Sequence, residues 1–492
     1  MTNPTQNNQD THLSLKVRLH RIADWIGALL GDNKQQEGKN SIAVLDGVRA
    51  IAIIMVIIFH VNRINGDNLW NQQTYPLASS ISTAGGTGVT LFFVLSGFLL
   101  FMPYAKALLF KTSWPLARVF YLRRVLRIVP AYYVSLFLII VFFHPEYLQR
   151  NHLQDLALFL TFFMDSSRST FRLLNGPYWT LAIEWQFYMI LPLIALGIAF
   201  LVRRVSQEKR LKAVIFCLLG VIAGGLFVRY WGIYFQVNWT KTFLVPRSVL
   251  NVISFFAYGI TGKYTEDFAV GMLISLCFVY SQRPEIGGKL LAKAQRLSSW
   301  LWGGGILLLV FSYMWHFNSA SYGWPFLDVL SPYYNWLSDI LLAIGYGACI
   351  VAVLYGPASL KRPFESRFLR WIGLISYSLY IWHLPLLIFL SQHLPTHLAG
   401  MNRYTIYAIN WVWVLVIIVP VAVLSYVLFE KPWMQLGDDL RRKIEKRHRS
   451  SANTTREVVA QLGTNPIHAA NGVAAPGATH SSGVQGEGSV SR

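Results

Sequence analysis

The stretch LDGVRAIAIIMVIIFH, residues 45–60, decides the fold class of this chain, because it is a long apolar run with few ionisable side chains. A helix needs about 20 predominantly apolar residues to cross a lipid bilayer. Similar runs recur along the 492-residue chain, which is 54% hydrophobic and only 13% charged. Soluble proteins carry about 25% charged residues. The sequence therefore predicts an all-α integral membrane protein.

We predict about ten membrane-spanning helices from these apolar runs. Their approximate ranges are 42–61, 87–105, 128–144, 179–202, 212–235, 266–281, 300–316, 335–356, 372–392 and 404–429. Several runs are shorter than the ~20 residues of a full span, so their boundaries are approximate. Two weaker apolar stretches, 153–164 and 248–260, are expected to form re-entrant or interfacial helices.

The lysines and arginines indicate how the predicted spans are oriented. With the N-terminus in the cytoplasm, the inner segments carry most of these residues and the outer segments carry few. Cytoplasmic loops of membrane proteins are enriched in Lys and Arg. The pattern therefore predicts both termini in the cytoplasm, in a multi-pass protein of the cell (plasma) membrane. It also accounts for the net charge of +20 without a nucleic-acid partner.

The chain divides into three predicted parts. Residues 1–41 form a cytoplasmic segment, in which residues 13–30 make an amphipathic helix that lies either on the inner leaflet or in solvent. Residues 42–433 form the membrane domain, and residues 434–492 form a tail that is basic and then, from residue 450, disordered. The three cysteines show no CxxC pattern, so neither a disulfide framework nor a metal site is indicated.

Ionisable side chains at membrane depth are costly, so they are the first candidates for function. Arg49 and His60 lie in the first span, 11 residues apart. This spacing places both on one helical face, about 16 Å apart along the axis. In the predicted orientation Arg49 is near the cytoplasm and His60 is in the outer half. The alternatives are that Arg49 extends toward the lipid headgroups and that His60 is a structural imidazole.

Glu184 and a pair of arginines complete the main candidates. Glu184 lies early in the fourth span. Its carboxylate is expected to orient or charge His60, and His60 is the expected general base. The alternative for Glu184 is a packing hydrogen bond to nearby aromatic residues. Arg124 and Arg127, just before the third span, share a helical face and suit phosphate recognition. From composition alone, a topological role or contact with anionic lipid explains these arginines better.

Three further polar positions in the apolar runs carry weaker signals. Ser96 precedes Gly97 in the second span, where close helix packing is a better explanation than a nucleophilic serine. His383, in the ninth span, either lines a cavity or marks a kink near Pro385. Arg229, near the outer end of the fifth span, is expected to extend its guanidinium toward the headgroups.

Six strings occur in a characteristic order along the chain. They are LDGVRA (45–50), GVTLFFVLSGFLLF (88–101), RRVLRIVP (123–130), WTLAIEWQFY (179–188), ISYSLYIWHLP (375–385) and FEKPW (429–433). Together they resemble the acyltransferase-3 family of multi-span membrane acyltransferases, over residues 43–433. The family's usual LDGLRG reads LDGVRA here, so Ala50 replaces a glycine while the arginine is retained.

The resemblance implies transfer of an acyl group to a hydroxyl, because the family acylates sugars of exported glycans and some small molecules. It implies roles for the residues that match the family's motifs, which are Arg49, His60, Arg124, Arg127 and Glu184. Some members carry an additional hydrolase-like domain at the C-terminus. The residues after the last span are expected to be too few for one.

The functional hypothesis is an O-acyltransferase that takes its acyl group from cytoplasmic acyl-CoA, with acetyl-CoA as the expected donor and with no metal. The phosphates of the CoA would bind Arg124, Arg127 and Arg49. His60 would act as general base on a hydroxyl of a glycan or glycolipid-like acceptor, with support from Glu184. The rival hypothesis is a transporter or flippase of lipid-linked glycans, in which the same side chains form a substrate or proton pathway.

Overall fold

The computed structural model describes residues 43–64, 70, 74–317, 324–393 and 401–463. Over these residues the regular elements are all helices, apart from an isolated bridge between Phe243 and Val245. The prediction of an all-α protein is therefore confirmed. The amphipathic helix expected at 13–30 and the last part of the tail, from residue 464, lie outside the described residues.

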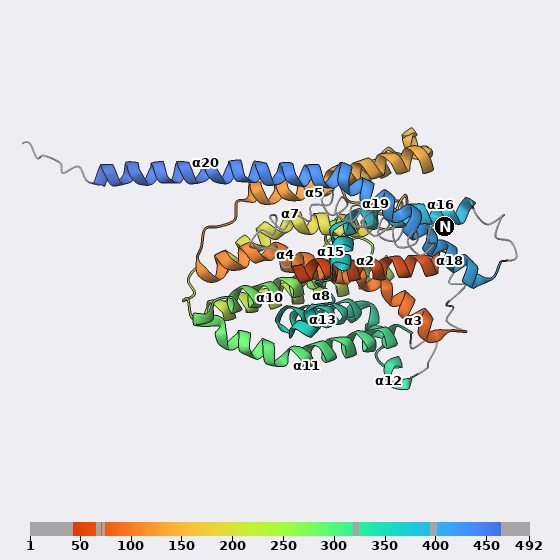
Figure 1. Cartoon of the computed structure of the whole chain (residues 1–492), viewed down its shortest axis with the longest axis horizontal. Coiled ribbons are helices and arrows are strands. Elements are labelled where there is room, and N and C mark those ends of the chain that lie inside the picture. The colour runs from red at the N-terminus through yellow and green to blue at the C-terminus, as the bar shows by residue number, and fades with distance from the viewer. Residues whose placement is uncertain (1–42, 65–69, 71–73, 318–323, 394–400, 464–492) are drawn as a thin grey trace, which may run out of the picture. The chain divides into compact units, whose positions relative to one another are not determined.

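Helices of very different lengths follow one another along the chain (Figure 1). The principal ones are α2 (Ala43–Arg63), α3 (Pro76–Ala84), α4 (Gly88–Phe110), α5 (Ala117–Phe143), α6 (Leu153–Leu160), α7 (Tyr178–Leu201), α8 (Arg210–Val237), α9 (Arg247–Ala257), α10 (Thr265–Ser281), α11 (Pro284–Phe317), α13 (Tyr334–Tyr355), α15 (Arg367–Leu374), α16 (Ser376–His393), α18 (Arg403–Trp413), α19 (Val419–Ser425) and α20 (Lys431–Gly463). Two π-helical segments, η7 (Val414–Ile418) and η8 (Tyr426–Glu430), flank α19.

Each of the ten predicted spans coincides with a helix. Eight helices of the described chain are long and apolar enough to cross a membrane, and α15 with α16 makes a ninth span if this pair, bent by 70°, is counted as one. The helix at the remaining predicted span is α10, which has 17 residues and begins with two acidic side chains. The weaker stretches form α6 and α9, as expected for short helices. The cytoplasmic location of both termini stays a prediction.

The predicted tail is helical past residue 450, where disorder was expected. The chain divides into two compact units, and the boundary falls between Asp439 and Leu440, within α20. This helix continues beyond Ser450, where disorder was expected, and ends at Gly463. Residues 456–462, REVVAQL, explain the difference, because Arg, Glu, Ala, Gln and Leu all favour helix.

Glycines allow a close approach in the most extensive helix contact of the first unit, between α4 and α10 (Figure 1). The α-carbon of Gly97 faces the carbonyl oxygen of Phe268, and that of Gly271 faces the carbonyl oxygen of Val94. A side chain at either glycine would overlap the opposite backbone. Small residues commonly permit such contacts between membrane helices. The prediction that Ser96-Gly97 marks helix packing is therefore confirmed.

The helix directions place several termini at one end of the first unit. The end of α2 packs beside the start of α4, because Gly88 lies against Ala52 and Val56. Helix α4 runs parallel to α10, since the Phe93 ring contacts Phe268 while the Phe98 ring contacts Phe278 further along. The end of α2 and the starts of α4 and α10 therefore lie at the same end of the bundle.

Candidate functional site

The centre of the candidate site is a pair of histidines from helices α2 and α16. Nε2 of His383 lies 3.2 Å from Nδ1 of His60, and the two ring centroids are 4.9 Å apart. His383 is fully buried and His60 is partly buried. The sequence left the role of His383 open between a cavity and a kink. The structure places this side chain against the predicted general base.

Backbone contacts determine which ring nitrogens carry protons. Nδ1 of His383 lies 3.0 Å from the carbonyl oxygen of Leu379, and Nδ1 of His60 lies 2.9 Å from that of Val56. A carbonyl oxygen only accepts, so each Nδ1 of a neutral pair must be the N–H donor. Nε2 of His383 then accepts from His60. Nε2 of His60 stays unprotonated and has no hydrogen-bond partner among the described residues, as a general base requires.

Glu184 does not contact His60, which corrects the expected pairing. Its carboxylate accepts hydrogen bonds from Ser96 of α4 and from Tyr188 one turn further along α7. The reason is depth. Gly88 of α4 packs against Val56, close to His60, whereas Ser96 is eight residues further along, about 12 Å away along the axis. Glu184 therefore lies nearer to the Arg49 end of α2, and His383 takes the place beside His60.

The predicted arginines gather at that other end of α2. Nη1 of Arg49 donates to Asp46 at 2.8 Å, and the Arg124 guanidinium lies 5.8 Å from the centre of the Tyr188 ring. The charge of Arg127 acts on both Arg49 and Arg124, so the three cations are within electrostatic range of one another. Glu184 acts on the same two arginines. The structure thus brings Arg49, Arg124, Arg127 and Glu184 together, and separates them from His60.

Glu430 is a buried carboxylate that the sequence analysis missed. It lies at the end of η8, is 1% exposed, and accepts a hydrogen bond from Ser378 of α16. The charge of Arg127 acts on it, so it belongs to the arginine end of the site. A π-helical turn often marks a functional site. The signal was present in FEKPW, but the last span was expected to end one residue earlier, at 429.

Arg172 is a second residue that the sequence analysis missed. It lies in the connection before α7 with a φ of 60°, a left-handed conformation that is unusual for arginine. Its guanidinium stacks over the rings of Phe171, at 5.0 Å, and Trp179, at 5.3 Å. The charge of Arg172 acts on His60. No sequence pattern could indicate this, because a single arginine in an irregular connection has no periodicity.

Arg229 belongs to a buried polar cluster, which corrects the expectation that it extends toward headgroups. Its Nε donates to Glu266 at 2.5 Å and its Nη1 donates to Asp339 at 2.6 Å. The Arg229 side chain is 5% exposed, because it lies inside the bundle between α10 and α13. Beside this cluster, Asp267 is completely buried, and neither of its carboxylate oxygens has a hydrogen-bond partner in the part of the chain that the structure describes.

The helical bundle and its buried ionisable groups together define a class of protein. It is a multi-span membrane protein with a polar site inside the bundle, where histidines and arginines lie at two depths. Among the described residues, no group of three or more His, Cys, Asp or Glu side chains is placed to hold a metal ion. The model of the family described as an acyltransferase domain matches residues 42–430. The chain therefore belongs to the acyltransferase-3 family, as its sequence strings indicated.

Two bacterial proteins illustrate what this chain is similar to. It is 28% identical to the peptidoglycan O-acetyltransferase OatA of Listeria monocytogenes over 70% of this chain and 49% of the relative. It is 23% identical to the O-acetyltransferase OatA of Staphylococcus aureus over 80% of this chain and 57% of the relative. The chain thus spans about half the length of these curated relatives. No solved structure matches it.

Proposed function

We propose that this protein is an O-acetyltransferase of the bacterial plasma membrane that moves an acetyl group from cytoplasmic acetyl-CoA to a hydroxyl of a cell-wall glycan. The histidine pair carries the proposal, because it leaves Nε2 of His60 free to accept a proton. Family membership and the names of the two relatives support transfer to a glycan rather than transport of one. The transporter hypothesis is therefore not favoured.

The arginine end of α2 is proposed to hold the donor. Arg49, Arg124 and Arg127 gather positive charge, and guanidinium groups bind phosphate oxygens through charge-assisted hydrogen bonds. In the predicted orientation this end faces the cytoplasm, where acyl-CoA is found. The phosphates would stay there, because moving them into hydrocarbon is too costly. Glu184 and Glu430 would keep the arginines in place through charge, rather than act on His60.

The histidine end is proposed to carry out the transfer. The acceptor oxygen attacks the thioester carbonyl carbon while Nε2 of His60 takes the hydroxyl proton. The C–S bond then breaks, the CoA thiolate leaves, and the proton on His60 passes to the sulfur. His383 accepts a hydrogen bond from Nδ1–H of His60, which fixes the ring and stabilises its charged form. The pantetheine arm would span the ~16 Å between the two ends of α2.

The test of this proposal is transfer of label. Membranes containing the full chain are incubated with acetyl-CoA labelled in the acetyl group, and the purified glycan is analysed for ester-linked label that mild alkali releases. Label in the glycan that depends on His60 supports an acetyltransferase. Translocation of a lipid-linked glycan without any labelled ester would instead support the transporter hypothesis.

A further inference from the structure

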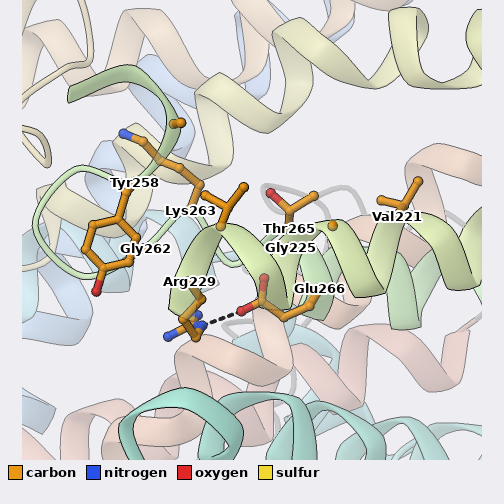
Figure 2. A pocket seen from close by; sticks show the side chains of 11 residues that line it. Val221, Gly225, Arg229, Tyr258, Gly262, Lys263, Thr265 and Glu266 are labelled. Atoms are coloured by element: carbon orange, nitrogen blue, oxygen red, sulfur yellow. Dashed lines mark hydrogen bonds and ion pairs between the residues drawn. The ribbon is translucent and has the colours of Figure 1, made fainter. Parts of the chain in front are cut away.

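A pocket of about 240 Å³ lies apart from the histidine pair, between α8, the end of α9 and the start of α10. Figure 2 shows Arg229, Tyr258, Lys263 and Glu266 around it. One water molecule occupies about 30 Å³ in the liquid. The pocket therefore has room for several waters, or for one ligand of the size of a sugar ring.

Two polar atoms at this pocket have no hydrogen-bond partner within the described part of the chain. Nη2 of Arg229 is buried and unbonded there, although Nε and Nη1 of the same side chain donate to Glu266 and Asp339. Oε2 of Glu266 faces Gly225, a residue of the pocket wall, and has no hydrogen bond among the described residues. A buried donor without a partner costs about 1–3 kcal/mol. A ligand that both donates and accepts hydrogen bonds would satisfy the two atoms together.

Both positive charges at the pocket are already paired with carboxylates of the protein. Arg229 is paired with two carboxylates, and Lys263 is paired with Asp165. An anion would therefore meet the carboxylates that hold Arg229, and a cation would meet Arg229 and Lys263. A neutral ligand avoids both of these repulsions between like charges. Hydroxyl groups suit the site best, since each is a donor and an acceptor.

The absence of a side chain at Gly262 leaves room beside the guanidinium of Arg229. Gly262 has a φ of 96°, and a β-carbon there would lie 3.4 Å from Cζ and Nη2 of Arg229. The guanidinium also stacks on the Tyr264 ring, 4.5 Å from its centre. The Tyr258 ring forms another part of the wall. An aromatic wall beside hydrogen-bonding groups is the combination that a sugar ring requires, since its faces are partly apolar and its edges carry hydroxyls.

The pocket lies at the same end of the bundle as His60. It includes the start of α10, and this start lies at the end of the bundle where α2 finishes. A row of contacts leads from one site toward the other. Arg229 stacks on Tyr264, the Tyr264 ring lies 5.9 Å from that of Trp179, and Arg172 stacks on Trp179. The charge of Arg172 acts on His60.

We propose that this pocket binds a neutral, hydroxyl-rich sugar unit of the acceptor glycan, as a subsite separate from the histidine pair. That the bound sugar belongs to the acceptor rests on the proposed function. The binding of a sugar in this pocket does not depend on it. The sugar hydroxyls would bond to Nη2 of Arg229 and to Oε2 of Glu266. A glycan chain anchored here would extend along Trp179 and Arg172 toward His60.

The test uses a substitution that fills the pocket without disturbing the ion pairs. Gly224 lines the pocket, and a β-carbon there has no heavy atom within 4 Å, so Gly224→Leu places a side chain in open space. Gly220, one turn earlier on α8, is equally open but is not part of the pocket, so Gly220→Leu is the matched control. The probe is a soluble N-acetylglucosamine oligomer, and its Kd is measured by calorimetry on the purified full chain in nanodiscs.

We expect Gly224→Leu to weaken binding of the oligomer by at least about tenfold, a loss of ~1.4 kcal/mol. Gly220→Leu should bind as the wild type does. Equal affinities in the two variants, or equal losses in both, would overturn the proposal. If the pocket result holds but no labelled ester forms in wild-type membranes, the proposed function fails and the sugar site stands. If label transfers with an unchanged acceptor KM in Gly224→Leu, the sugar site fails instead.

Discussion

At the residue scale, the account depends on the free nitrogen of His60. His60→Ala removes the base, so we expect kcat to fall by at least ~10², the lower range for general base catalysis. The KM for acetyl-CoA should change little, because the arginines lie at the other end of α2. Transfer of labelled acetyl groups, measured at equal protein levels, checks this. Unchanged rates would remove His60 from the mechanism.

His383 acts through His60, so its loss should be milder. Without His383, the N–H of His60 keeps only the carbonyl oxygen of Val56 as acceptor. We expect His383→Ala to lower kcat about tenfold, less than the removal of the base itself. We also expect it to shift the pH–rate profile, which a purely structural role would not do. The pH dependence of kcat is the measurement.

His393→Ala is the matched control for this prediction. His393 lies on the same helix, and its Nδ1 bonds to the carbonyl oxygen of Phe389, with no further hydrogen bond among the described residues. It should leave both the rate and the pH profile unchanged. An equal effect of the two alanine variants would show that His383 contributes only to the stability of α16.

The sequence could predict single residues of the site better than their partners. Arg49, His60, Arg124, Arg127 and Glu184 stand out because ionisable groups are rare in apolar runs. The pairing of His60 with His383 joins residues 323 positions apart, so no local spacing could indicate it. The contact of Glu184 with Ser96 depends equally on how α7 packs against α4. Depth estimated from span order alone was too coarse to separate Glu184 from His60.

At the element scale, the glycine contact between α4 and α10 leaves no space for a larger side chain. We expect Gly271→Ala to destabilise the fold by about 1–3 kcal/mol, the usual effect of overpacking, because its methyl group would overlap the carbonyl of Val94. Gly303→Ala on α11 is the control, since a β-carbon there meets nothing within 4 Å. Thermal unfolding in detergent measures both. If Gly271→Ala and the control had the same Tm, the close approach of α4 and α10 at Gly271 would be contradicted.

Element positions could be predicted because each span is a long apolar run, and all ten runs are helical. Their irregularities could not. The 70° bend between α15 and α16 and the π-helical segments around α19 depend on neighbouring helices rather than on local composition. The same is true of Arg229. The sequence showed an arginine near the end of a span, and only the fold brought Glu266 and Asp339 to it.

At the scale of the whole molecule, the account assigns donor binding and transfer to opposite ends of α2. The double variant Arg124→Ala with Arg127→Ala should mainly raise the KM for acetyl-CoA, because it removes binding that is equal in ground and transition states. We expect a rise of at least about tenfold, the effect of one lost charge-assisted hydrogen bond. Steady-state kinetics at varied acetyl-CoA are the measurement. A fall in kcat with an unchanged KM would place the arginines in the transfer step instead.

The most direct test of this two-ended site uses vesicles in which the protein has one known orientation. Labelled acetyl-CoA is supplied on one side and the glycan acceptor on the other, and the label in the acceptor is counted. The account predicts transfer only when acetyl-CoA is on the side that bears Arg124 and Arg127, the predicted cytoplasmic face. Equal use of acetyl-CoA from both sides would contradict it.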